Sequence, residues 1–506
     1  MSGSSTRRRA LFSLNDTTDV VDHARILIEN GWEIIASDET VEVLRNSEIE
    51  VQSVSEFTGV AENYDFPPTL HPRIEAALTG DSTPSIELVY IIPYPLEIGL
   101  DVGGRTLLAL AIKGNKFPIM DREDMERFIA NIEAEQKNSE SLRRALSTKA
   151  LREITTFYKN LHSLDESAGP YELMNGENPY QVPATAYPAG DNLDSLSMFK
   201  FNRVAGDPPC YTNLADMNSI IHTLCLAVEA FKANGVGVPY ICVAAKHGNP
   251  CGMGVSFDQT DEAINRALWG NPLSIWGGEV ITNFSIDKTI ANLLFKSSKR
   301  EAECSSPYWM LDMVVAPEIS PEAVKVLRKR KSRKLMVNPA LQDPCVSKEA
   351  DTLRQVRGGY LQQNNLNYIL QLNECEPGSA DLNIESLTSL IISWSVAYSS
   401  FHGGNEIALA KGASLVSVGG GPSTVEAART AIQRAQDSGT TMKNLTFTAD
   451  AFFPFTDAPE TLVNSGVNAG CVPAGGKHEQ EVREYFNTNE VDVHYIPEQF
   501  RGFCRH

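Results

Sequence analysis

Short apolar runs alternate with helical patterns over residues 1–135, an order that few folds accommodate. The apolar runs are Arg9–Leu14, Trp32–Ala36 and Ile86–Ile92, and a helical pattern over Thr18–Glu29 separates the first two. Strands that alternate with helices form βαβ units, in which helices cover both faces of a parallel sheet. The N-terminal part of the chain is therefore predicted to be an α/β domain.

A charged, helical stretch follows this domain. It contains no Gly or Pro between Asp124 and Ala168. Its apolar stripe consists of Leu142, Leu146, Leu151, Ile154 and Phe157. From Gly169 onward Gly and Pro become frequent, and strand, turn and helix patterns alternate again. We therefore predict an α/β domain over residues 1–135, a helical connector over 136–168 and a second α/β domain over 169–506.

Composition limits the compartment and the partners. The 506 residues include 44 Lys and Arg against 64 Asp and Glu, a net charge of −20. Such a surface repels phosphates, so no nucleic-acid partner is expected. Nine Cys without a Cys-x-x-Cys pair predict no disulfide framework, no structural metal site and a cytoplasmic location. The N-terminus lacks an apolar signal region, and Ser and Thr interrupt the nearest apolar run, Leu387–Tyr398, so no membrane span is expected.

Lys246 and His247 follow an apolar run, Pro239–Ala245, and precede a loop and a helix that begins at Asp261. Ligands of open α/β sheets bind at the carboxyl ends of strands, which favours chemistry at these two residues, although a simple turn has the same composition. Cys251 could act as a nucleophile paired with His247, or could be a turn residue. It cannot belong to a deaminase-type zinc site, because the second Cys and the His-x-Glu are missing.

Two more strand ends carry candidate residues. Gly419–Gly421 lie between an apolar run and a helical pattern over Ser423–Gln436, which suits either an anion at a helix N-terminus or a tight turn. Asp450 ends a third run, Thr446–Asp450, and precedes the aromatic segment Phe452–Phe455. That segment could orient a planar heterocycle or simply belong to the core.

Beyond these general patterns, Tyr211–Asp216 and Ala245–Gly252 closely resemble the family of bifunctional AICAR transformylase/IMP cyclohydrolases. Further segments recur in that family's order: Ala36-Ser37, Val54–Gly59, Thr69–Pro72, Asp101–Gly104, Gly176–Gln181, Ser274–Gly278, Asp450–Phe455 and Arg501–His506. The resemblance covers nearly the whole chain.

The resemblance implies a methylglyoxal-synthase-like N-terminal domain, followed by a transformylase domain of two cytidine-deaminase-like α/β units. It also implies a homodimer with active sites at the interface. The reaction of that domain moves a formyl group from the cosubstrate 10-formyltetrahydrofolate to a weakly nucleophilic aromatic amine. A monovalent cation site, which the family's transformylase domain can contain, is a further expectation.

The same resemblance assigns roles to individual residues. His247 would manage the amine proton with electrostatic help from Lys246, Asn405 would donate to the developing formyl oxyanion, and Asp450 would face the folate. Residues expected on the folate side are Phe452, Phe453 and Pro454, and those expected on the acceptor side are Asn175, Thr424 and Arg501.

The N-terminal domain departs from the family at its phosphate site. Asp38-Glu39 stand where the family has Gly-Gly, Thr17 stands where it has Lys, and Phe66–Pro68 replace Arg-Val-Lys. Two carboxylates would repel a phosphate. Although Tyr94, Asp101 and Lys113 persist, we predict that this domain is a retained scaffold without cyclohydrolase activity.

The transformylase half departs on its nucleotide side. Met174-Asn175 replace the family's Arg-Tyr, Val425 replaces an Arg, and two residues are inserted around Phe401–Gly404. Losing bidentate Arg contacts weakens binding of AICAR. The basic stretch Arg328–Lys334 suits either a solvated helix face or an anion contact.

The sequence thus predicts an N-formyltransferase of one-carbon metabolism that acts on an amine other than AICAR, in specialised metabolism. One alternative is a housekeeping AICAR transformylase of purine biosynthesis. The other is a catalytically silent regulatory paralogue, which the joint retention of Lys246, His247, Asn405 and Asp450 disfavours.

Overall fold

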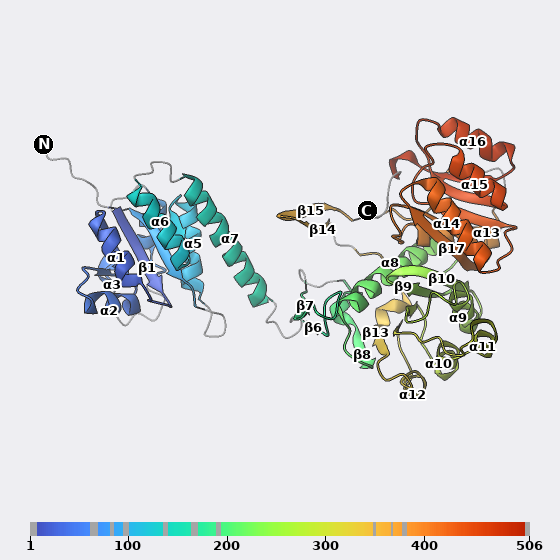
Figure 1. Cartoon of the computed structure of the whole chain (residues 1–506), viewed down its shortest axis with the longest axis horizontal. Helices are drawn as coiled ribbons and strands as arrows, with labels where there is room; N and C mark the ends of the chain where they lie inside the picture. The colour runs from blue at the N-terminus through green and yellow to red at the C-terminus, as the bar shows by residue number, and fades with distance from the viewer. Residues whose placement is uncertain are drawn as a thin grey trace. The chain divides into compact units, whose positions relative to one another are not determined.

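A computed structural model describes residues 8–60, 69–80, 85–94, 101–134, 140–162, 171–188, 194–347, 351–365, 368–376 and 382–500. The chain divides into two compact units, Met1–Gly169 and Pro170–His506. Figure 1 shows their elements.

The first unit is built on a five-stranded parallel sheet with the order β3-β2-β1-β4-β5. Its strands are β1 (Arg8–Leu14), β2 (Trp32–Ala36), β3 (Gln52–Ser53), β4 (Ile86–Ile92) and β5 (Phe117–Ile119). Its helices are α1 (Val20–Glu29), α2 (Asp38–Asn46), α3 (Val54–Thr58), α4 (Pro72–Thr79), α5 (Val102–Lys113), α6 (Arg122–Glu133) and α7 (Glu140–His162). The predicted apolar runs are therefore strands, and the parallel sheet is confirmed.

Each face of this sheet has its own core, because successive side chains of a strand point to opposite faces. In β1, Ala10 and Phe12 pack with α1 and α6, whereas Leu11 packs with α4 and α5. Helix α7, in the segment expected to be a connector, buries Leu146 in the first core and Ala150 in the second. This helix therefore packs within the first unit.

The second unit contains an 11-stranded mixed sheet with the order β20-β19-β18-β16-β17-β10-β9-β11-β12-β13-β8. Its strands are β8 (Asn202–Ala205), β9 (Tyr240–Lys246), β10 (Asn249–Ser256), β11 (Glu279–Thr282), β12 (Met313–Ala316), β13 (Lys334–Val337), β16 (Asn405–Lys411), β17 (Ser414–Gly421), β18 (Leu445–Ala449), β19 (Val467–Pro473) and β20 (Asp492–Ile496). Its helices are α8 (Tyr211–Ala233), α9 (Thr260–Leu268), α10 (Lys288–Phe295), α11 (Ser298–Cys304), α12 (Pro321–Leu327), α13 (Ile384–Ala397), α14 (Thr424–Asp437), α15 (Asp457–Ser465) and α16 (Glu479–Thr488). Two separate two-stranded ribbons pair β6 (Tyr171–Leu173) with β7 (Ala184–Ala186) and β14 (Asp351–Val356) with β15 (Gly359–Asn364).

The large sheet contains one arrangement twice. A helix and an antiparallel hairpin, α8-β9-β10, precede a helix and three further strands, and α13-β16-β17 begins the same series again. In the first half β9 pairs antiparallel with β11, and β11, β12 and β13 are parallel. In the second half β16 pairs antiparallel with β18, and β18, β19 and β20 are parallel. The halves meet where β10 pairs with β17. The predicted α/β class of the second unit is thus confirmed, and its large sheet consists of two halves with the same order of elements.

Helices α8 and α13 share one apolar core on one face of the large sheet. Helices α9, α10 and α12 form a second core with it, and α14–α16 form a third. Helix α8 is long and apolar enough to cross a membrane by length and composition alone. However, 67% of its most apolar window is buried inside the protein, as in the core helix of a folded unit. The run Leu387–Tyr398 lies in and just after α13 and belongs to the same core.

The prediction of a loop between Lys246 and a following helix is wrong. Asn249–Gly252 are the first residues of β10, and a two-residue turn at His247-Gly248 joins β9 to β10. Both turn residues have positive φ, 52° and 68°, the backbone that tight hairpins require. These residues form a strand because they pair with β9. Their Gly- and Pro-rich composition is typical of a loop, so sequence patterns do not predict the strand.

The predicted turn at the three glycines is also wrong, because Gly419–Gly421 are the last residues of β17. A Cβ on Gly419 would lie 2.3 Å from the backbone nitrogen of Ala431 and 2.4 Å from the carbonyl of Ala427, both in α14. Glycine is therefore needed so that α14 can pack closely on the strand. At the third strand end β18 stops at Ala449, just before the predicted end of the run, and Asp450 follows it.

Candidate functional site

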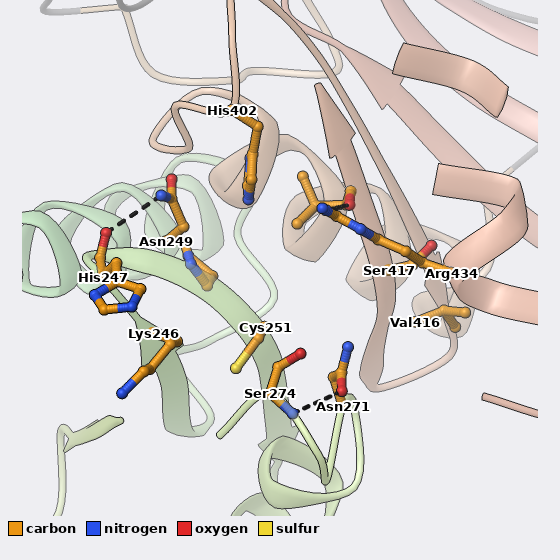
Figure 2. A pocket seen from close by; sticks show the side chains of 12 residues that line it. Lys246, His247, Asn249, Cys251, Asn271, Ser274, His402, Val416, Ser417 and Arg434 are labelled. Carbon is orange, nitrogen blue, oxygen red and sulfur yellow. Dashed lines mark hydrogen bonds between the residues drawn. The ribbon is translucent and has the colours of Figure 1, made fainter. Parts of the chain in front are cut away.

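Lys246 and His247 line a cavity of about 270 Å³ at the junction of the two halves of the large sheet (Figure 2). The ladder between β10 and β17 joins Gly254 to Ser414. The cavity is lined farther along the two strands, by Asn249–Cys251 of β10 and Val416–Val418 of β17. Other lining residues are Asn271, Ser274, His402 and Arg434. The size is near the lower end for small-molecule pockets, which hold roughly 300–1,000 Å³.

The β9–β10 turn presents His247 to this cavity. The His247 side chain is exposed, and its backbone carbonyl accepts a hydrogen bond from Nδ2 of Asn249 at 3.2 Å. A Cβ on the neighbouring Gly248 would lie 3.1 Å from the side chain of Ser219 in α8. Close packing of the turn on α8 therefore fixes the position of His247.

Lys246 lies beside two acidic side chains. Its Nζ donates to the carbonyl of Gly277 at 2.6 Å. Burial raises the pKa of Glu279 to about 9, helped by the adjacent carboxyl of Asp216, and burial likewise raises the pKa of Asp216. Two carboxyls that share a proton leave one negative charge near the ammonium, which fixes the lysine at the end of β9.

Cys251 lines the same cavity, but burial raises the pKa of its thiol to about 12. The thiolate is the nucleophilic form of cysteine, so this environment argues against Cys251 as a nucleophile.

Asn405 and Asp450 are buried and do not belong to the described lining of the cavity. Nδ2 of Asn405 donates to the carbonyl of Gly421 at 3.1 Å. Oδ1 of Asp450 accepts from the backbone nitrogen of Glu406 at 2.8 Å, and the Asp450 nitrogen donates back to the Glu406 carbonyl at 3.1 Å. Asp450 therefore ties the end of β18 to the start of β16.

A histidine that no sequence pattern indicated also lines this cavity. His402 lines it from the loop before β16, and its Nδ1 lies 2.8 Å from Oε2 of the buried Glu406. The available signal was the insertion around Phe401–Gly404, which places a His four residues before a Glu. Spacing alone does not reveal that the side chain of Glu406 turns back onto the loop.

The residues expected on the folate side differ in exposure. Phe453 is buried with Phe447 and Phe486, Phe452 is half-buried against Gly476, and Pro454 is half-buried.

On the acceptor side, Asn175 donates through Nδ2 to the Gly176 carbonyl at 2.7 Å, and Thr424 is the buried first residue of α14. Met174 is exposed, whereas Val425 packs partly against the core under α14. Arg501 lies outside the described residues.

Three residues of the basic stretch have internal partners. Arg333 is 1% exposed and donates to the carbonyls of Leu311 and Leu327. Arg330 donates to the carbonyl of Met310, and Lys334 pairs with Asp312 at 3.0 Å. These three side chains therefore neither form a solvated helix face nor are free to bind an anion.

In the first unit, carboxylates occupy the expected phosphate site. Asp38 and Glu39 begin α2, and the Tyr94 hydroxyl donates to Oε2 of Glu39 at 2.6 Å, which raises the pKa of Tyr94 to about 12. Asp101 accepts from the backbone nitrogens of Gly104 and Tyr94. Within the described residues of the whole chain, no group of three or more His, Cys, Asp or Glu could hold a metal ion.

Comparisons with known proteins agree with this architecture. A family model described as the AICARFT/IMPCHase bienzyme matches residues 116–434. The bifunctional purine biosynthesis protein PurH of Persephonella marina is 27% identical over 535 residues, covering 96% of this chain and 97% of that protein. PurH of Bacillus cytotoxicus is 29% identical over 545 residues, covering 98% and 99%. A solved structure titled "Crystal structure of ForH" is 23% identical and covers 30% of this chain and 95% of that chain, with a TM-score of 0.27.

Proposed function

Because the chain belongs to the AICARFT/IMPCHase bienzyme family, we propose that it transfers the formyl group of 10-formyltetrahydrofolate to an amine other than AICAR. The observation that carries this proposal is the position of Lys246 and His247 together at one cavity, while Met174 and Val425 stand in place of the family's nucleotide contacts. A site that keeps its proton-handling pair and loses its guanidinium contacts suits the same reaction on a different acceptor.

In the proposed reaction the acceptor nitrogen attacks the formyl carbon, and His247 takes a proton from that nitrogen as the tetrahedral adduct forms. Lys246 stabilises the negative charge that develops nearby. Asn405 has a second N–H besides the one bonded to Gly421, and this N–H would donate to the formyl oxygen. Its burial and its bond to Gly421 would hold the donor in place before the substrate arrives.

The folate would lie on the side of Phe452 and Pro454. The ring of Phe452 covers Gly476, where a Cβ would come within 2.8 Å of it, so the glycine permits this position. Phe453 would act indirectly, since its ring belongs to the core and fixes the turn that carries its neighbours. Asp450 would hold that turn against Glu406.

The finer fold assignment is also a proposal. The five-stranded parallel sheet of the first unit supports a methylglyoxal-synthase-like domain, and the repeated halves of the second support two cytidine-deaminase-like units. The cytoplasmic location, the monovalent cation and the specialised pathway stay predictions.

We also propose a homodimer, and an exposed ribbon supports it. Strands β14 and β15 are exposed along almost their whole length, including Leu353 at 67%, Tyr360 at 69% and Leu361 at 60%. A lone two-stranded hairpin is only marginally stable in water. A second copy of the chain that covers these apolar side chains would stabilise it.

The N-terminal unit is expected to form no IMP from formyl-AICAR. Asp38 and Glu39 replace a phosphate-binding turn with two negative charges, and Glu39 also engages the hydroxyl of Tyr94. The measurement is IMP formation by the full-length protein, with a bifunctional family member assayed in parallel. Turnover near that of the control would contradict the expectation.

The acceptor proposal is tested by comparing AICAR with a panel of unphosphorylated aromatic and aliphatic amines, using 10-formyltetrahydrofolate as donor. The wild type should formylate members of the panel and bind AICAR poorly. The double variant Met174→Arg/Val425→Arg should gain affinity for AICAR on the order of 10- to 100-fold for each contact restored.

The matched control for this experiment is Met174→Gln/Val425→Gln, which adds length without charge. Because Val425 packs partly against the core, the thermal unfolding midpoint of each variant should be measured too. A wild type that already prefers AICAR with a low KM would establish the housekeeping alternative instead.

A further inference from the structure

His402 and Glu406 form a hydrogen-bonded pair at the wall of the cavity. Glu406 is 1% exposed, and His402 binds both of its carboxylate oxygens. The backbone nitrogen of His402 donates to Oε1, and Nδ1 of its ring lies 2.8 Å from Oε2. A buried carboxylate thus holds the loop and the imidazole together.

Three contacts from distant segments hold this pair in place. Asp450 fixes the backbone of Glu406 by the two reciprocal bonds described above. Gly420 lies opposite Glu406 in the β16–β17 register, and a Cβ there would lie 2.5 Å from both Oε1 of Glu406 and Cβ of His402. The backbone nitrogen of Phe401 donates to Oδ1 of Asn249 at 2.8 Å, which ties the loop to the β9–β10 turn.

These bonds leave one ring nitrogen of His402 for chemistry. A carboxylate only accepts hydrogen bonds, so in a neutral imidazole paired with one Nδ1 is the donor and Nε2 is the nitrogen with the lone pair. In Figure 2 the imidazole points from its loop toward the cavity that Lys246 and His247 also line. A histidine held at Nδ1 by a buried carboxylate is oriented to accept a proton at Nε2.

The other charged or titratable groups that line the cavity are Lys246, His247, Arg434 and the thiol of Cys251. Asp and Glu are absent from the lining as far as the described residues show. Lys246 and Arg434 disfavour an ammonium ion beside them, whereas the carboxylate of Glu406 behind His402 and the Asp216–Glu279 pair beside Lys246 act in the opposite direction. The group placed to take a proton from an ammonium ion is therefore His402, because its carboxylate partner stabilises the imidazolium that forms.

Resting on the formyl transfer proposed above, we propose that His402 is a second proton acceptor of this site and that the acceptor is an aliphatic amine, protonated in solution. An aromatic amine reacts in its neutral form, and the proton it loses goes to N10 of the folate. An aliphatic ammonium ion has one proton more to lose before its nitrogen can attack. The site contains one histidine for each proton.

Each proton that the ammonium nitrogen loses has an acceptor. Nε2 of His402 takes a proton from the ammonium ion, and the freed lone pair forms the C–N bond to the formyl carbon. The second proton of that nitrogen passes through His247 to N10 of the folate as the C–N10 bond breaks. The products are the formamide, tetrahydrofolate and one proton, which His402 releases to solvent.

The experiment measures kcat/KM of the full-length protein between pH 6 and 10 with matched aliphatic and aromatic amines, benzylamine beside aniline among them. His402→Ala should lower kcat/KM for aliphatic amines by roughly 10²- to 10³-fold near pH 7 and change aromatic amines little. In the variant, kcat/KM for an aliphatic amine should rise tenfold per pH unit until the amine itself titrates, at about pH 9–10. The wild-type profile should level off at lower pH.

A second variant and a control separate chemistry from structure. Added imidazole should restore part of the aliphatic activity of His402→Ala, which a structural role would not permit. Glu406→Gln should lose activity with the same selectivity for aliphatic amines. His478→Ala removes another His–Glu pair, 3.0 Å apart and outside the described cavity lining, and should match the wild type.

The outcomes distinguish this inference from the proposed function. Equal losses for both amine classes without imidazole rescue, aliphatic activity that His402→Ala leaves unchanged, or a wild type active on aromatic amines alone would overturn the role of His402 and preserve formyl transfer. A wild type that transfers formyl to no amine would overturn both.

Discussion

His247→Ala is expected to turn over roughly 10²- to 10⁴-fold more slowly than the wild type, the range that one positioned general acid/base contributes. The imidazole lies at the β9–β10 turn and lines the cavity. Without it the acceptor nitrogen would have to lose its proton to water as the adduct forms. Steady-state kcat and KM for both substrates, with the Kd of a folate analogue, measure the effect. The Kd should change little, because His247 acts on the acceptor.

Two further variants make this result specific. His247 has a φ of 52°, a backbone that Asn adopts more readily than Ala, so His247→Asn should lose the same activity without added backbone strain. Cys251→Ser should retain most of the activity, because burial raises the pKa of the thiol to about 12 and leaves little thiolate. Abolished activity in Cys251→Ser together with a spared His247→Ala would instead indicate a thiol mechanism.

Asn405→Ala is expected to lower kcat by about 10²- to 10³-fold, the usual loss on removing one oxyanion donor. The reason is that its free N–H would stabilise charge that exists only after the amine has attacked the formyl carbon. The KM for the folate donor should therefore change much less than kcat. A raised KM with an unchanged kcat would instead show that Asn405 contributes only to binding.

A structural control is needed for Asn405. Its amide also donates to the carbonyl of Gly421, directly opposite it in the β16–β17 register. Removing that buried bond costs about 1 kcal/mol of stability in either alanine or serine variants. Thermal unfolding midpoints of Asn405→Ala and Asn405→Ser therefore measure the structural part. A loss of kcat in a variant that is still folded at the assay temperature is then due to the oxyanion contact.

Local sequence patterns predicted much of the first unit. The runs Arg9–Leu14, Trp32–Ala36 and Ile86–Ile92 form parallel strands, because strands buried on both faces are apolar without interruption. The same reasoning placed Lys246 and His247 at a strand end.

The same patterns failed where pairing partners decide the structure. Asn249–Gly252 form a strand because β9 pairs with them, and Gly419 lies in a strand because β16 pairs with it. Arg333 lies in a basic stretch typical of a solvated surface, yet its side chain is buried and donates to the carbonyls of Leu311 and Leu327. Each of these environments is supplied by other segments of the chain.

The sequence by itself determined the family, the α/β class and the residue pair at the end of β9, since motifs and apolar periodicity are properties of contiguous residues. Only the tertiary structure decided what surrounds that pair. His402 reaches the cavity because Asn249 holds its loop, Asp450 holds Glu406 and Gly420 leaves room for both side chains. Those contacts join β10, β16, β17 and β18, and Asn249 precedes Phe401 by 152 residues. A proton-accepting site assembled from segments so far apart has no local pattern, because its geometry exists only after the strands have paired.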